Sequence, residues 1–154
     1  IKIEKKNLNS KIPIVLKIAP DINDKEIEKI SEILLSNDIE AIIISNTSDE
    51  TREKLKDIQK HQKGGLSGKP IEDKTNLLIS KFYNNFKKIG VGGVDTGLGA
   101  YNKFLSGADL IQLYTGMVYK GPNIVNLIKN DLSELLLKDG VKNFKEIIGK
   151  KTKT

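Results

Sequence analysis

Four short apolar runs divide the chain, and each is followed by a segment in which apolar residues recur with helical spacing. The runs cover residues 12–18, 40–45, 89–94 and 108–116. Their apolar character is largely continuous rather than alternating, which predicts strands buried on both faces, as in a parallel sheet. Lys17 interrupts the first run, and the pair Gly92-Gly93 interrupts the third.

Helices are predicted after these strands. A stripe of Ile27, Ile30, Ile33 and Leu34 marks the first helix, which runs to about residue 37 from a cap at Asn23 or Asp24. Further helices are expected at about residues 72–86, 97–105, 123–137 and 144–148. The polar segment 48–63 is expected to be a long loop with at most a short helix. The alternation of strand and helix predicts an α/β fold with parallel strands and right-handed crossovers.

The last two runs end in loops suited to a phosphate. One ends in Gly92-Gly93, where backbone can approach a ligand closely, and the other ends in Tyr114-Thr115-Gly116. A (β/α)₈ barrel commonly binds phosphate with the loops after its last two strands, and it needs about 250 residues. We therefore expect the 154 residues to form one partial-barrel domain, residues 1–154, with four βα units. This would be the C-terminal half of a TIM-type barrel, ending in a basic tail at residues 150–154.

Composition narrows the possible partners. The net charge of +6 comes almost entirely from lysine, because Arg52 is the only arginine. These lysines are interleaved with acidic residues, which is typical of solvated helix faces, so we expect no nucleic-acid partner. The chain has no cysteine and only one histidine, His61, so neither a thiolate nor a multi-histidine metal site is expected. His61 lies in a polar stretch and is expected to be solvated.

No targeting or membrane segment is expected in this chain. No apolar stretch approaches the roughly 20 residues of a membrane span, and no apolar core of a signal peptide follows the charged first residues. Because the chain does not begin with methionine, we expect it to start within a longer protein or after processing.

Residues that could bind a ligand or take part in a reaction lie at the carboxyl ends of the predicted strands, where the sites of parallel α/β folds are found. They are Lys17, the triplet Ser45-Asn46-Thr47, the glycine loop 64–68, Gly92-Gly93 and Tyr114-Thr115. Each has an ordinary alternative. Lys17 could extend from the barrel rim into solvent, Asn46 could be a turn residue that caps the next element, and the glycines could serve only for flexibility or packing. Their occurrence in order at successive strand ends favours a shared site.

These motifs resemble the C-terminal half of dihydroorotate dehydrogenase, in particular the quinone-dependent class 2 enzymes. The resemblance extends from about residue 13 to residue 149, with the motifs in family order. It rests on Lys17-Ile18-Ala19-Pro20-Asp21, Ser45-Asn46-Thr47, Gly64-Gly65-Leu66-Ser67-Gly68-Lys69-Pro70, Gly90-Val91-Gly92-Gly93-Val94 and Gln112-Leu113-Tyr114-Thr115-Gly116.

The resemblance implies FMN as cofactor, with dihydroorotate oxidised to orotate and quinone reduced in de novo pyrimidine synthesis. It further implies hydride transfer from the substrate C6 atom to the flavin while a base removes the C5 proton. The residues implied to bind FMN are Lys17, Ser45, Ser67, Gly68, Gly93, Tyr114 and Thr115. Those implied to bind the orotate ring are Asn46 and Thr47.

Three departures from the family pattern qualify these expectations. The N-terminal half, which supplies the catalytic base and the membrane-associating region, is not present, so we expect no catalytic residue here and no activity from this chain alone. The full-length protein is expected to lie peripherally on the cytoplasmic side of the inner membrane. The run before Gly90 is short, with Ile89 as its main apolar residue, so among the four predicted strands this one has the weakest sequence pattern. Ser45 replaces a threonine and keeps its hydroxyl group.

Two other functions fit part of the sequence. A different phosphate-binding barrel, such as a sugar-phosphate isomerase, would explain the last two strands but not the ordered set of Lys17, Asn46 and the glycine loop. A non-catalytic half-barrel would fold, by pairing with a second copy, without performing chemistry, since open sheet edges favour association.

Overall fold

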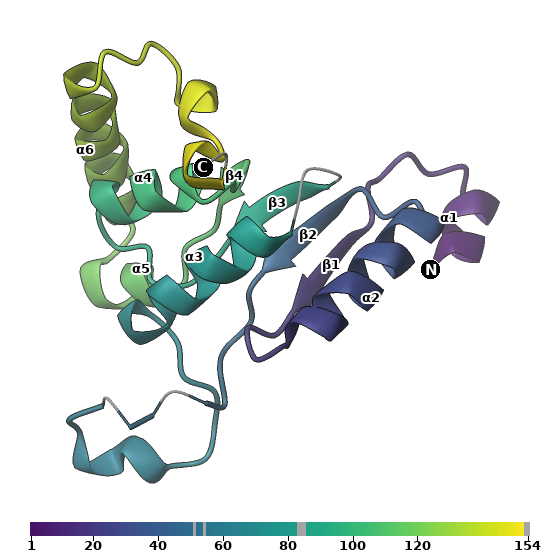
Figure 1. Cartoon of the computed structure of the whole chain (residues 1–154), viewed down its shortest axis with the longest axis horizontal. Coiled ribbons are helices and arrows are strands. Elements are labelled where there is room, and N and C mark those ends of the chain that lie inside the picture. Colours follow the sequence, from purple (N-terminus) through teal and green to yellow (C-terminus); the bar gives the residue numbers. More distant parts are fainter. Residues whose placement is uncertain (51, 54, 83–85, 153–154) are drawn as a thin grey trace.

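The computed structural model describes residues 1–50, 52–53, 55–82 and 86–152. One parallel sheet organises this part of the chain, with strands β1 (Val15–Ile18), β2 (Ala41–Ile44), β3 (Lys87–Gly90) and β4 (Leu110–Ile111). The strands lie in the order β1-β2-β3-β4, so each pairs with its neighbour in sequence (Figure 1). The predicted alternation of parallel strands and helices is confirmed.

The helices follow the strands as the apolar stripes predict. They are α1 (Lys2–Asn7), α2 (Asp24–Ser36), α3 (Glu72–Lys81), α4 (Gly97–Leu105), α5 (Thr115–Lys120) and α6 (Ile124–Lys138). Short 3₁₀ helices are η1 (Ile58–His61), η2 (Lys69–Ile71), η3 (Phe144–Ile147) and η4 (Lys150–Thr152). Helices α1 and α5 were not predicted from the sequence. The helix predicted to run from residue 72 to about residue 86 ends at Lys81, and residues 83–85 of that prediction lie outside the described part.

The largest apolar core lies between the sheet and helices α2 and α3, which run side by side across it in Figure 1. Ile42 and Ile44 from β2 and Ile79 from α3 are fully buried there. A second core lies between α4 and α6 and contains Ala100 and Ile124. These cores hold the strand ends that carry the candidate site.

β1 differs from its prediction. The run 12–18 was expected to be buried on both faces, but Ile18 alone is buried within β1, and Leu16 is 39% exposed. In the described chain β1 pairs only with β2, so it forms an edge of the sheet. The prediction that Ile33 belongs to the buried stripe of α2 is also wrong, since this residue is 56% exposed.

β3 confirms a strand at the third apolar run, although it covers residues 87–90 rather than 89–94. Lys87–Gly90 pairs in parallel with β2 over four positions and with β4 over two. Asp109 adds to this pairing. Its carboxylate accepts a hydrogen bond from the Lys88 backbone N–H at 2.9 Å and forms an ion pair with the Lys87 ammonium at 3.0 Å. Backbone pairing on both sides therefore compensates for the weak apolar pattern.

The polar segment expected as a loop forms an excursion that projects from the body of the molecule in Figure 1. Its base is an antiparallel bridge between Ser48 and Leu66. Within it the Arg52 guanidinium donates to the carbonyls of Lys60, Gln62 and Gly64. None of the helices in the described ranges is long and apolar enough to span a bilayer.

Candidate active site

A cavity of about 790 Å³ opens at the carboxyl ends of the strands. Strands β1 to β4 all deliver residues to it, as the parallel arrangement requires. All the residues predicted to bind cofactor or substrate line this cavity: Lys17, Ser45, Asn46, Thr47, Ser67, Gly68, Gly93, Tyr114 and Thr115. The fold thus brings together residues that lie almost 100 positions apart in sequence.

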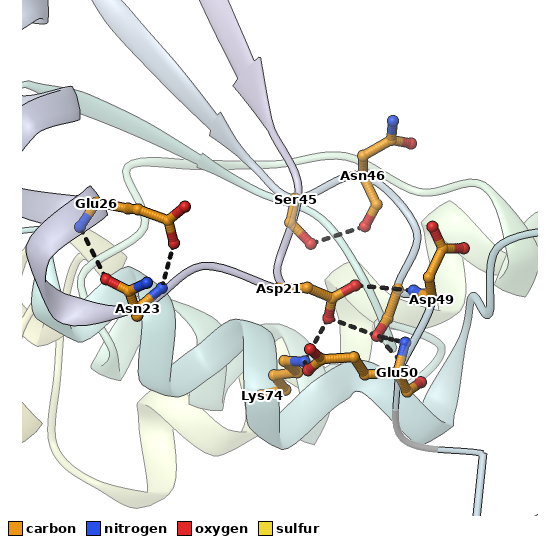
Figure 2. A network of polar contacts seen from close by, with 9 residues as sticks. Asp21, Asn23, Glu26, Ser45, Asn46, Asp49, Glu50 and Lys74 are labelled. Atoms are coloured by element: carbon orange, nitrogen blue, oxygen red, sulfur yellow. Dashed lines mark hydrogen bonds and ion pairs between the residues drawn. The ribbon is translucent and has the colours of Figure 1, made fainter.

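The triplet after β2 forms one wall of the cavity. Ser45 is buried, and its hydroxyl donates to the carbonyl of Asn46 at 2.8 Å. The backbone N–H of Asn46 donates to the carbonyl of Ile18 at 2.8 Å, which fixes the triplet to the end of β1. In Figure 2 the Asn46 side chain points away from the polar network beneath it, and it is exposed. The side-chain amide of Asn46 can therefore both donate and accept a hydrogen bond toward a ligand.

The glycine loop forms a second wall and contacts the segment after β4. The Thr115 hydroxyl lies 2.9 Å from the Ser67 hydroxyl, so the two loops meet inside the cavity. Gly65 lies against Thr47, where a Cβ would fall 1.9 Å from the threonine Oγ1. Only glycine allows this approach, so the loop is in contact with the triplet after β2 as well.

The double glycine after β3 forms the floor. Gly93 has φ +78°, and a Cβ there would lie 2.3 Å from Glu72 Cβ. The residue is therefore restricted to glycine by both conformation and space. β4 itself is short, and α5 begins at Thr115 without a side-chain cap in the described structure. Tyr114 and Thr115 thus lie at a helix start rather than within the predicted strand.

The charges lining the cavity favour an anion. Its lining includes Lys17, Lys69 and Lys120 but only one carboxylate, that of Asp95. Lys120 lies 3.1 Å from Asp95, while Lys69 pairs with Glu72. The Glu72 hydrogen bond raises the pKa of Lys69.

Lys17 differs from these lysines, because no ion pair or hydrogen bond of its side chain is found among the described residues. Sequence reasoning singled out neither Asp95 nor Lys120. Their positions, just after the double glycine and at the end of α5, were the available signal.

A buried lysine supports the floor of the cavity from below. Lys103 of α4 is fully buried and donates to Thr75 Oγ1 at 2.9 Å and to Asn76 Oδ1 at 2.8 Å. Burial lowers its pKa to about 8, although Glu72 partly opposes this shift. Thr75 also donates to the carbonyl of Glu72 at 2.9 Å. Lys103 therefore joins α4 to the start of α3, against which Gly93 packs.

His61 does not take part in this site. It lies at the end of η1 in the excursion, is exposed as predicted, and is not among the residues lining the cavity. Among the described residues no group of three or more acidic or histidine side chains could hold a metal ion.

Four parallel βα units with a cavity at their carboxyl ends define the chain as part of a (β/α)₈-barrel protein. A family model described as dihydroorotate dehydrogenase matches residues 2–136. The chain therefore belongs to the dihydroorotate dehydrogenase family.

Curated relatives and solved structures agree with this assignment. The chain is 40% identical to a dihydroorotate dehydrogenase (quinone) of Bartonella tribocorum over 94% of its length, and 35% identical to one of Haloarcula marismortui over 89%. It also matches DHODH of Eimeria tenella in complex with ferulenol, with a TM-score of 0.88 and 32% identity over 94% of the chain.

The chain spans only part of each relative. It covers 41% of the Bartonella protein and 40% of the Haloarcula protein and the Eimeria chain. The predicted C-terminal half of a TIM-type barrel is confirmed by this coverage together with the parallel sheet.

Proposed function

We propose that this chain forms part of an FMN-dependent enzyme that oxidises dihydroorotate to orotate in de novo pyrimidine synthesis, with quinone as electron acceptor. The names of the relatives support the reaction and the acceptor. One structural observation carries the proposal: the nine residues that the family resemblance assigns to FMN and orotate line a single cavity.

The residues at one end of the cavity lining are suited to the phosphate of FMN. Glycine at position 93 leaves the backbone bare where a side chain would collide with Glu72. The neighbouring Thr115 carries a hydroxyl group, and α5 begins at this residue with its first amides directed toward its N-terminus. Gly93, Tyr114 and Thr115 would together hold the phosphate. Ser67 and Gly68 would lie along the ribityl chain and ring.

When bound, FMN supplies the two-electron acceptor for a hydride leaving C6 of dihydroorotate. Lys17, which lines the cavity, would place a positive charge beside the ring and favour electron-rich groups there. Asn46 and Thr47 offer hydrogen bonds that orient the amide and carbonyl groups of the substrate. Ser45, buried beneath them, fixes the backbone of this wall. The carboxylate that lines the cavity, that of Asp95, is paired with Lys120 at 3.1 Å.

The proposal includes two further statements about the whole protein. The catalytic base is supplied by the part of the relatives' length that this chain does not span, so the 154-residue chain alone does not turn over. The same part mediates peripheral membrane association on the cytoplasmic side of the inner membrane, where quinone is available.

The test uses the full-length protein, meaning this chain joined to the remaining part of the relatives' length. Formation of orotate would be followed in the presence of dihydroorotate and a soluble quinone. We expect turnover by the full-length protein and none by the 154-residue chain. In the full-length protein, Lys17→Met should slow hydride transfer at least tenfold, whereas the exposed-surface control Lys29→Met should not. Absence of turnover in the full-length protein with FMN added would contradict the proposal.

A further inference from the structure

The carboxylate of Asp21 lies at the centre of a polar network just behind the cavity wall formed by residues 45–47 (Figure 2). Its side chain is only 15% exposed. Oδ1 accepts a hydrogen bond from the Ser48 hydroxyl at 2.7 Å, and Oδ2 accepts one from the Asp49 amide at 2.8 Å. Lys74 of α3 also donates to Oδ1. Asp21 thus connects the loop after β1, the segment after β2 and the helix α3.

This network continues into the glycine loop. Ser48 pairs with Leu66 through two backbone hydrogen bonds, of 2.9 and 2.7 Å. Leu66 directly precedes Ser67, and Ser48 directly follows Thr47. The residue that Asp21 binds is therefore next to both the substrate-facing pair and the loop that contacts Thr115.

A persistent negative charge suits this role. Burial by itself would raise the pKa of Asp21, but the hydrogen bonds from Lys74, Ser48 and Asp49 outweigh it and lower the pKa. Burial likewise opposes the charge of Lys74, yet its bonds to Asp21 and Glu50 raise its pKa. The pair therefore stays ionised at neutral pH, and both carboxylate oxygens remain acceptors.

We infer that Asp21 is a positioning residue for substrate binding, which acts by fixing the segment 46–49, with Lys74 as its counter-charge. What the segment binds rests on the proposed function. Asp21 itself does not line the cavity. Its effect passes through Ser48 and Asp49 to the side chains of Asn46 and Thr47, whose exposed amide and hydroxyl groups need a rigid backbone to meet a ligand in one orientation.

The test substitutes Asp21→Asn in the full-length protein. An amide keeps the shape but offers one acceptor oxygen instead of two, so one of the two anchoring bonds is lost. We expect faster hydrogen exchange at the Asp49 amide and a KM for dihydroorotate raised about tenfold, which corresponds to about 1.4 kcal/mol. The flavin content, measured by visible absorbance, should stay as in the unmodified protein, because the hydrogen bonds of Asp21 go to Ser48, Asp49 and Lys74 and none goes directly to a phosphate-holding residue.

Asp24→Asn is the matched control. Asp24 also pairs with a lysine of α3, Lys81, at 2.6 Å, but it is exposed and is not among the residues lining the cavity. It should leave both KM and Asp49 exchange unchanged. An unchanged KM in Asp21→Asn, a parallel loss of flavin, or an equal effect of Asp24→Asn would overturn the inference.

A second variant covers the case in which Asp21→Asn does not fold. Lys74→Met keeps the bonds from Ser48 and Asp49 but removes the counter-charge, which raises the pKa of Asp21. The rise in KM on acidification should then begin at higher pH than in the unmodified protein, and an unshifted pH profile would overturn the inference. If the unmodified protein shows no dihydroorotate oxidation, the proposed function fails. Hydrogen exchange at the Asp49 amide in Asp21→Asn then tests whether Asp21 fixes the segment 46–49. Faster exchange would support this role, and unchanged exchange would overturn it.

Discussion

Lys103 shows how single residues support the site without touching it. Lys103 is fully buried, and its hydrogen bonds within the described part of the chain go to the neutral side chains of Thr75 and Asn76. Its methylene stem passes beside Gly90, at the end of β3. A charge in this position costs stability at neutral pH unless its hydrogen bonds compensate for lost hydration.

The lowered pKa of Lys103 should make the free energy of unfolding depend on pH. Its pKa is lowered to about 8 in the native protein, whereas the unfolded chain keeps the ordinary value of 10.5. Between these values the unfolded state binds the extra proton, so the contribution of Lys103 to stability rises with pH. We expect the free energy of unfolding, relative to Lys103→Met, to increase by about 2 kcal/mol from about pH 7.5 to about pH 9.5.

Urea unfolding at several pH values measures this difference. Lys29→Met serves as the control, because Lys29 is exposed on α2. A difference between the unmodified protein and Lys103→Met that does not change with pH would contradict a buried, titrating ammonium at position 103.

The residues of the site could be predicted because parallel strands end at the same edge of the sheet. Lys17 lies near the end of β1, and Asn46 and Gly93 follow β2 and β3, so their convergence follows from topology alone. The network of Asp21 with Lys74 could not be predicted in this way. Its partners meet through the crossing of two loops and a helix, and residue spacing does not encode that crossing.

Helix α2 shows local sequence signals acting at the scale of an element. Asn23 caps its N-terminus by accepting from the Glu26 amide at 3.1 Å, and the Glu26 side chain accepts from the Asn23 amide at 2.8 Å (Figure 2). This capping box satisfies two backbone donors that a helix start otherwise leaves open. It begins α2 directly after the loop that carries Asp21.

Removal of the cap should weaken this element measurably. Asn23→Ala is expected to lower the free energy of unfolding by about 1 kcal/mol, because the Glu26 amide loses its acceptor. Urea unfolding measures the change, and Lys29→Ala, at an exposed position within α2, provides the control. A loss no larger than that of the control would show that the cap does not stabilise the helix.

The elements that sequence reasoning misjudged depend on partners beyond their own residues. β3 forms despite its two lysines because β2 and β4 pair with it on both sides. β1 is exposed despite its apolar run because it is an edge strand in this chain. Hydrophobic patterning predicts what a strand can bury, whereas pairing depends on the neighbours that the fold provides.

At the scale of the molecule, the sheet is open at β1 and β4, and the cavity lies across its carboxyl edge. The chain spans about 40% of the relatives it matches. The fold class followed from the βα alternation, and the half-barrel from its combination with chain length.

The central claim is that the cavity at the strand ends binds FMN through its phosphate. The most direct test is a crystal structure of the full-length protein purified with FMN. We predict a phosphate within hydrogen-bond distance of the backbone at Gly93 and of Thr115, with the flavin ring beside Lys17. A flavin bound elsewhere, or a protein that takes up no flavin under these conditions, would contradict the account.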